Sequence, residues 1–147
     1  MKTAARAIII VDKHLLLMKR VVENNTYYTL VGGAVADGET PQQALIREVK
    51  EESQLDVISS RLVFTEYSPD PVASQYIFLC EVATSTAIGI DPRSEESIRN
   101  EIGLDLHELT WLKQDMFAKI PFRTPRLQTA IIKALRQGFP DEPTQLY

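Results

Sequence analysis

The sequence predicts an α/β or α+β fold, in which a mixed β-sheet carries helices packed on it. Segments rich in β-branched and aromatic residues occur together with two segments of helical apolar periodicity. No repeat, low-complexity tract or linker divides the chain. The chain has 147 residues, of which 44% are hydrophobic, so we expect one compact domain over residues 1–147.

The N-terminal third predicts a hairpin followed by a third strand. Residues 4–11 and 15–19 are apolar, and the turn residues 12–14 interrupt them. Residues 27–31 have the β-branched and aromatic content of a strand and lead directly into Gly32 and Gly33. Two adjacent glycines predict a close backbone approach or unusual dihedral angles at this point.

The best-marked helix begins after Thr40 and runs to about Ser53. Thr40 is a favourable N-cap, Pro41 suits the first helical position, and Gln43 completes a capping box. The remaining segments follow from apolar patterning and turn residues. They are strands at 57–67 and 75–82 with a turn at 68–71, a long polar connection at 84–103, a strand at 106–112, a helix at 124–137 and a frayed tail at 139–147.

Composition and charge narrow the functional classes. Lys and Arg total 16 against 20 for Asp and Glu, so the net charge of -4 gives no electrostatic footprint for a nucleic-acid polymer. A bound divalent cation could still serve a polyanionic small substrate. The single cysteine, Cys80, lies in an apolar run and is predicted to be an inert buried thiol.

No apolar stretch reaches the roughly 20 residues that a membrane helix needs, and the N-terminus lacks the pattern of a secretory leader. We therefore expect a cytoplasmic protein that does not enter a membrane. The sequence leaves open whether the protein forms a homodimer.

Three carboxylates share one face of the 40–53 helix. Glu48, Glu51 and Glu52 stand at i, i+3 and i+4, where side chains are neighbours and like charges repel. One interpretation is a solvated charged face with an Arg47–Glu51 pair. The other is a divalent cation, because clusters of carboxylate oxygens suit Mg²⁺ or Mn²⁺. On the opposite face the periodicity predicts packing against the sheet by Leu45, Ile46, Val49 and Ser53.

The residues before the 40–53 helix favour the interpretation of the acidic face as a divalent-cation site. Five residues separate Gly33 from Glu39, and seven more precede the run 47–52, which Gln54 and Leu55 follow. This register resembles the Nudix box, G-x5-E-x7-R-E-U-x-E-E-x-G-U with U a bulky aliphatic residue, and places the box at 33–55. Gln54 replaces the final glycine, where a left-handed cap is expected to cost on the order of 1 kcal/mol. Gln54 is not a ligand position, so we expect the chemistry to be retained.

The resemblance implies an α/β/α sandwich and a Mg²⁺-dependent hydrolase, with Mn²⁺ as an alternative, that cleaves a pyrophosphate bond. It implies metal ligation by the Gly33 carbonyl, Glu48 and Glu52, with Glu51 as a direct or water-mediated partner. Arg47 would orient Glu48 and Glu39 through charge-assisted hydrogen bonds.

The resemblance leaves the general base open, because family members use either a box glutamate or one from a distant loop. The distant candidates are Glu95, Glu96 and Glu101 of the polar connection, although a solvated acidic loop explains each of them at least as well. Glu48 is the base if none of them reaches the site. Arg20 is a candidate phosphate contact by resemblance, with an ordinary surface arginine as the alternative.

The substrate is expected to be a nucleotide-derived small molecule. The short chain favours nucleoside triphosphates, including oxidised ones, whereas ADP-ribose and sugar nucleotides are the alternatives. Pro69 and Pro71 straddle a position where some ADP-ribose-cleaving members carry proline, but the turn explains them equally well. Tyr27, Tyr28 and Trp111 suit either base stacking or core packing.

Two rival classes compete with the hydrolase. A non-catalytic Nudix module that senses a nucleotide would not need a repelling carboxylate cluster. An interaction protein with an incidental acidic helix would require the whole register to be coincidence.

Overall fold

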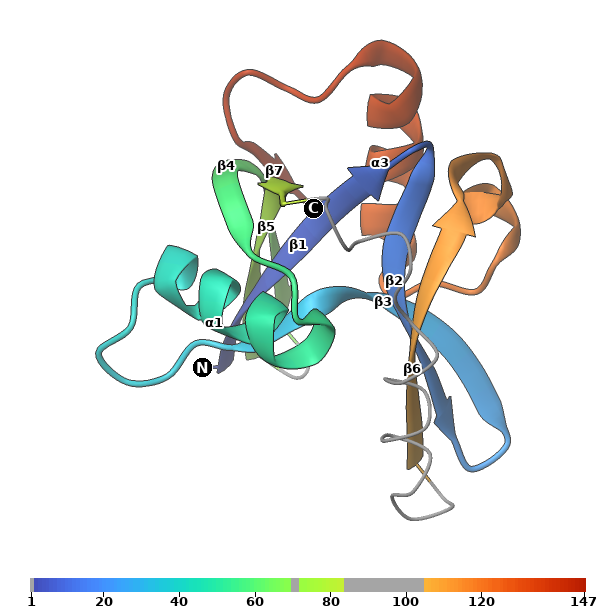
Figure 1. Ribbon diagram of the computed structural model, residues 1–147, viewed down its shortest axis with the longest axis horizontal. Helices are drawn as coiled ribbons and strands as arrows, with labels where there is room; N and C mark the ends of the chain where they lie inside the picture. The colour runs from blue at the N-terminus through green and yellow to red at the C-terminus, as the bar shows by residue number, and fades with distance from the viewer. Residues whose placement is uncertain (1, 70–71, 84–104) are drawn as a thin grey trace.

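Figure 1 shows a computed structural model, which describes residues 2–69, 72–83 and 105–147. The described elements are, in chain order, β1 (Lys2–Val11), β2 (His14–Val22), β3 (Asn25–Ala34), α1 (Pro41–Ser53), β4 (Val57–Pro69), β5 (Val72–Val82), β6 (Asp105–Lys113), the 3₁₀ helix η2 (Gln114–Lys119), α3 (Pro125–Gln137) and β7 (Thr144–Leu146).

The strands form one sheet of seven in the order β6-β2-β3-β1-β5-β4-β7, with a further short pairing between β1 and β2. β1 runs parallel to β5 and β4 parallel to β7, whereas the other pairs are antiparallel. The mixed sheet that the sequence predicts is confirmed.

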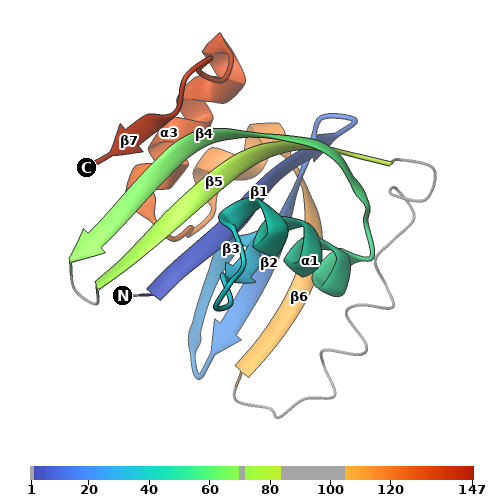
Figure 2. The same cartoon turned by 90° about the vertical axis from the view of Figure 1, so that its left-hand side faces the viewer.

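Helices α1 and α3 cover opposite faces of the sheet (Figures 1 and 2). Successive strand residues point to opposite faces. In β1, Ala7 and Ile9 therefore belong to the core under α1, while Ile8 belongs to the core under α3. The arrangement is an α/β/α sandwich, as the resemblance implied.

The first hairpin closes more tightly than the sequence predicts. Asp12 and Lys13 form a two-residue turn with φ of 51° and 62°, and His14 already begins β2. Two consecutive positive φ angles are typical of the hairpin turns whose twist matches that of the strands they join.

Helix α1 confirms the predicted start in detail. Thr40 accepts a hydrogen bond from the Gln43 backbone N–H, and the Gln43 side chain accepts one from the Thr40 N–H, which is the predicted capping box. Gln54 adopts the left-handed conformation, with φ 65° and ψ 13°, and its N–H closes the helix on the Lys50 carbonyl. The non-glycine cap is accommodated without loss of the helix end.

The packing face of α1 requires one correction. Leu45, Val49 and Ser53 are buried as predicted, but Ile46 is 47% exposed, and Ala44 is buried in its place. Helix α1 contacts mainly β3 and β1, and the stripe that faces these strands turns toward Ala44 and away from Ile46.

The frayed tail predicted for 139–147 is also wrong. Residues Thr144–Leu146 form β7, which pairs in parallel with Phe64–Glu66 of β4. The Phe139 ring packs 6.4 Å from the Phe64 ring, measured between centroids. A three-residue strand is too short for its periodicity to be read, and it forms because β4 offers an open sheet edge.

Two predicted features lie outside the described residues. They are the polar connection with its acids Glu95, Glu96 and Glu101, and the centre of the turn at 68–71. The strand and helix predicted at 106–112 and 124–137 are confirmed as β6 and α3. Within the described ranges, no helix combines the length and apolar character needed to cross a membrane.

Candidate active site

Arg47 is hydrogen-bonded both to the loop that precedes α1 and to neighbouring glutamates of the helix. Its guanidinium donates two hydrogen bonds to Glu39, from Nε to Oε2 at 2.7 Å and from Nη2 to Oε1 at 2.9 Å. It also donates from Nη1 to Glu48 Oε1 at 2.9 Å and, more weakly, to Glu51 Oε1 at 3.3 Å. The planar fork of arginine suits this bidentate contact. Arg47 thus lies where the resemblance placed it, between Glu39 and Glu48.

The Arg47–Glu39 pair stays ionised across the neutral range. Hydrogen bonds from Arg47, and then from the Ala36 N–H, lower the pKa of Glu39 to about 2. The same contacts with Glu39 and Glu48 raise the pKa of Arg47. The loop between Gly33 and α1 is therefore held against the helix by charge-assisted bonds.

The surroundings of Glu52 act on its pKa in the opposite direction to those of Glu39. Glu52 Oε1 accepts a hydrogen bond from the Gly32 N–H at 2.9 Å. Burial raises its pKa to about 7, with further increases from the charges of Glu48 and Glu51, although the Gly32 N–H and Arg6 act against the shift. The surroundings of Glu52 therefore disfavour its charged form.

Gly33 has no room for a side chain. A Cβ atom there would lie 2.6 Å from both Cδ and Oε2 of Glu48. The absence of a side chain thus lets the Glu48 carboxylate approach the backbone of β3. At the neighbouring Gly32, with φ 145°, a Cβ would lie 2.1 Å from the Ala5 carbonyl oxygen. Both glycines serve close approach, as the sequence predicts.

The donor set fits a hard divalent cation. Glu48 and Glu52 both approach the Gly32–Gly33 segment, and oxygen ligands of this kind suit Mg²⁺ or Mn²⁺. A cation would also offset the burial and the carboxylate repulsion that together raise the pKa of Glu52. In the described part of the chain, no three acidic, histidine or cysteine side chains already converge as a ligand shell. Glu51 is 58% exposed and contacts Arg47 instead.

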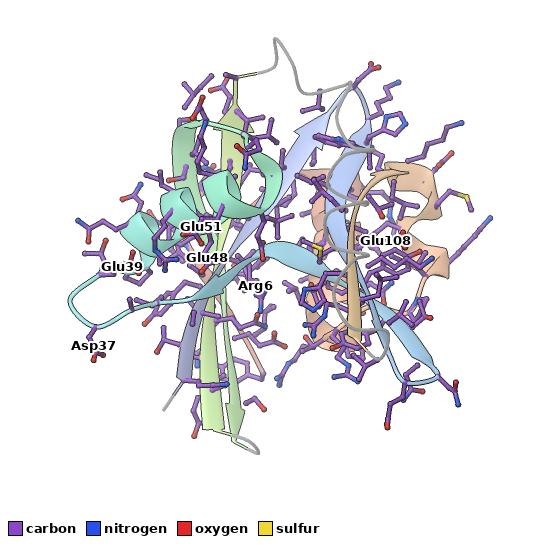
Figure 3. The ribbon with its side chains drawn as sticks, turned by 60° about the horizontal axis from the view of Figure 1, so that its bottom comes forward. Arg6, Asp37, Glu39, Glu48, Glu51 and Glu108 are labelled. Atoms are coloured by element: carbon purple, nitrogen blue, oxygen red, sulfur yellow. The ribbon has the colours of Figure 1, made fainter. Side chains whose placement is uncertain are left out.

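Arg6 is a site residue that the sequence analysis missed. It lies on β1 (Figure 3), on the sheet face that Ile8 shares with α3, and it donates to the Gly32 carbonyl at 3.1 Å, to the Leu30 carbonyl at 3.3 Å and to Gln75 Oε1 at 3.3 Å. Burial lowers its pKa, whereas the charges of Glu52 and Glu48 raise it. The available signal was an arginine within an otherwise apolar strand.

Arg20 lies apart from the carboxylate cluster. It lines a cavity that it shares with Arg6 and Tyr27, and its guanidinium lies 5.9 Å from the centre of the Tyr27 ring. Trp111 is half-buried and packs against the core under α1, which favours core packing over base stacking. Burial raises the pKa of Cys80 to about 12, in agreement with an inert thiol.

Comparison with known sequences places this site in a family. Residues 1–127 match the family model of the NUDIX domain. The "NAD-capped RNA hydrolase NudC" of Edwardsiella ictaluri is 32% identical over 110 residues, which are 75% of this chain and 38% of that protein. The protein of the same name from Salmonella typhi is 33% identical over the same extent. The chain thus matches well under half the length of these curated relatives.

Solved structures share the fold. A NUDIX hydrolase from Nitrosomonas europaea superposes with a TM-score of 0.70 at 19% identity, covering 98% of this chain and 77% of that one. An ADP-ribose pyrophosphatase from Streptococcus suis gives a TM-score of 0.64 at 21% identity and covers 98% of both chains. The box register, the sandwich and the family match agree, and the chain belongs to the NUDIX domain family.

Proposed function

We propose that the chain is a hydrolase that depends on a divalent metal and cleaves a pyrophosphate bond in a nucleotide-derived small molecule. The observation that carries the proposal is the approach of Glu48 and Glu52 to the Gly32–Gly33 backbone. These two carboxylates repel each other, and a stable fold gains nothing from placing them together. Membership of the NUDIX family supports the same function.

Glu48, Glu52 and the Gly33 carbonyl would hold Mg²⁺, or Mn²⁺ in its place, with Glu51 bound directly or through water. When bound, such an ion neutralises phosphate oxygens and makes a coordinated water more acidic. Arg47 positions Glu48 through the 2.9 Å hydrogen bond, and its two bonds to Glu39 keep the guanidinium from rotating away. Glu48 and Glu95 are the candidates to accept the proton of the attacking water.

The comparisons support two classes of substrate. The matched relatives are named as hydrolases of NAD-capped RNA, and the structural neighbours include MutT proteins as well as an ADP-ribose pyrophosphatase. We propose nucleoside triphosphates, including oxidised ones, and retain dinucleotides and ADP-ribose as the second class. The predicted lack of a nucleic-acid polymer partner stays a prediction, because the names of these relatives include a capped RNA.

The proposal is tested by phosphate and pyrophosphate release in Mg²⁺ from a panel of substrates. The panel contains normal and oxidised nucleoside triphosphates, ADP-ribose, NAD, sugar nucleotides, dinucleoside polyphosphates and a NAD-capped RNA. Glu52→Gln is the inactive control, and Glu142→Gln removes the same charge from an exposed position. Turnover that EDTA and Glu52→Gln abolish, but Glu142→Gln does not, supports the hydrolase. No turnover, with a panel compound still raising the melting temperature, favours the nucleotide sensor.

A further inference from the structure

We propose that a cavity at the N-terminus of α3 binds a phosphate group that the substrate carries in addition to its scissile pyrophosphate. We call it the arginine cavity. The inference rests on the proposed function for the position of the scissile bond, but the cavity and its charge are independent of that function. It encloses about 200 Å³ and is lined by Arg6, Arg20, Tyr27, Thr29, Leu30, Gln75, Arg123, Thr124 and Leu127.

The charged side chains that line the arginine cavity are those of Arg6, Arg20 and Arg123, and none of the lining residues is acidic. Burial lowers the pKa of Arg6, the charges of Glu52 and Glu48 raise it, and the nearby charge of Arg20 lowers it. An anion in the cavity would offset the repulsion between Arg6 and Arg20.

Arg123 is poised to bind an anion. Its guanidinium lies 3.9 Å from the centre of the Tyr27 ring. Such stacking occupies the face of the guanidinium and leaves its N–H groups directed outward from the edges. In residues 2–69, 72–83 and 105–147 this group has no carboxylate partner. The Arg123 backbone N–H is fixed to the Tyr28 carbonyl at 3.0 Å, so the side chain starts from an ordered position.

The stacked arginine also disfavours a nucleobase as the occupant. Arg123 already covers one face of the Tyr27 ring, so a base could not stack on that face. Thr124, the N-cap of α3, also lines the cavity, and its hydroxyl already donates to the carboxylate of Glu66. The arginine forks match the oxygens of a phosphate.

Arg6 links the arginine cavity to the proposed metal site, because it donates to the Gly32 carbonyl and the Gly32 N–H donates to Glu52. A second cavity of about 360 Å³ shares Arg6, Gln75 and Thr124 with it and extends to Ala34, the residue after Gly33. Glu66 borders this second cavity, but Arg126 and Thr124 already bond its carboxylate. A substrate whose pyrophosphate lies at Glu48 and Glu52 can therefore extend along β1 and place a further phosphate among the arginines.

The first experiment measures binding without turnover. Isothermal titration calorimetry in Mg²⁺ compares AMP with adenosine 2′,5′-bisphosphate and adenosine 3′,5′-bisphosphate, which differ only by a second phosphate. We expect at least one bisphosphate to bind about tenfold more tightly, which is 1.4 kcal/mol. Arg123→Gln should remove most of that difference, whereas Arg136→Gln, which removes the same charge near the far end of α3, should keep it.

The second experiment measures kcat/KM for matched substrates. NADPH against NADH, and coenzyme A against dephospho-coenzyme A, place the extra phosphate on a ribose. The comparison of ATP with ADP places the extra phosphate on the polyphosphate chain. The pair whose two kcat/KM values differ therefore shows which part of the substrate carries the phosphate that the cavity binds. We expect one pair to differ about tenfold in favour of the more phosphorylated member. Arg123→Gln should reduce the ratio, and Arg136→Gln should not.

The two experiments separate the two proposals. Preferential binding of a bisphosphate without hydrolysis of any substrate would refute the proposed function and keep the anion site. Equal binding of AMP and both bisphosphates, or a preference that Arg123→Gln leaves intact, would overturn the anion site whether or not the chain is a hydrolase. Unchanged melting temperatures of both variants would show that the exposed substitutions leave the fold intact.

Discussion

Glu66 is a buried carboxylate and Glu52 a half-buried one, and the charges of the two are compensated very differently. Glu66, on β4, is 3% exposed and accepts hydrogen bonds from Gln75 Nε2 at 2.9 Å, Thr124 Oγ1 at 2.5 Å and Arg126 Nε at 2.9 Å. Glu52, on α1, accepts one from the Gly32 N–H, and the nearby charges of Glu48 and Glu51 help to raise its pKa.

The difference separates a structural group from a functional one. Glu66 joins the start of α3 to two strands and has its charge matched by Arg126, so its surroundings are complete within the protein. We propose that a cation from outside completes the surroundings of Glu52, because burial and the charges of Glu48 and Glu51 raise its pKa. An undercompensated, half-buried charge is therefore the better candidate for the site of chemistry.

The largest expected effect follows from removing the undercompensated charge. Glu52→Gln should lower kcat/KM by about 100- to 1,000-fold, a loss of the size caused by removing one stabiliser of transition-state charge. Stability in EDTA should not fall, because the amide oxygen still accepts from Gly32 while the repulsion disappears. Thermal unfolding measures the stability, and kinetics on the substrate that the panel identifies measure kcat/KM. A variant that unfolds more easily and keeps its activity would reverse the roles assigned to Glu52 and Glu66.

Arg47→Lys should have the next largest effect. Lysine cannot make the two parallel bonds to Glu39 while also holding Glu48, so kcat/KM should fall by about 10- to 100-fold. Arg136→Lys is the matched control on an exposed arginine. Activity close to wild type would show that the Arg47 contacts are incidental to the site.

Glu66→Gln should act on stability first. We expect the free energy of unfolding to drop by about 2 kcal/mol, the range for hydrogen bonds to a charged group. The Arg126 side chain is 37% exposed, so water softens the loss of the ion pair. Urea unfolding measures the change. A loss of kcat/KM as large as that of Glu52→Gln, at conditions where the protein is folded, would contradict the structural role.

The pH dependence of stability should differ with and without Mg²⁺. Burial raises the pKa of Glu52 from 4.5 to about 7, so the metal-free folded state binds more protons than the unfolded state between these values. Stability in EDTA should therefore contain a component that falls as pH rises from about 4.5 to 7. Mg²⁺ favours the carboxylate, so its stabilising effect should grow over the same window. Thermal unfolding in EDTA and in Mg²⁺ across this range tests both signs, and a metal effect independent of pH would refute the assignment.

Gln54→Gly should produce the smallest effect. The left-handed conformation of Gln54, with φ 65°, is unfavourable for a side chain and free for glycine. We expect the free energy of unfolding to rise by roughly 1 kcal/mol or less, with activity unchanged. A large gain or loss of activity would show that the departure from the family pattern at Gln54 adjusts the site as well as the helix end.

Sequence reasoning succeeded where the determinants are local. The start of α1 depends on Thr40, Pro41 and Gln43, which are neighbours in the chain, so its capping was predictable. The positions of Arg47 and Glu48 follow from fixed helical spacing.

The rest depends on contacts between distant segments. Glu66 meets partners that lie 9, 58 and 60 residues away, so no local pattern marks it. Arg6 was missed for the same reason, since Leu30, Gly32 and Gln75 become its partners only when β1 lies between β3 and β5. The β7 strand depends likewise on the open edge of β4.

The central claim is that Glu48 and Glu52 form a divalent-cation site, and Mg²⁺ titration calorimetry tests it most directly. Measured at a pH above the Glu52 pKa, the wild type and Glu142→Gln should bind Mg²⁺ with the same affinity. Glu52→Gln should bind at least about tenfold more weakly, because it loses one of two carboxylate ligands. Equal affinity of Glu52→Gln and the wild type would contradict the account.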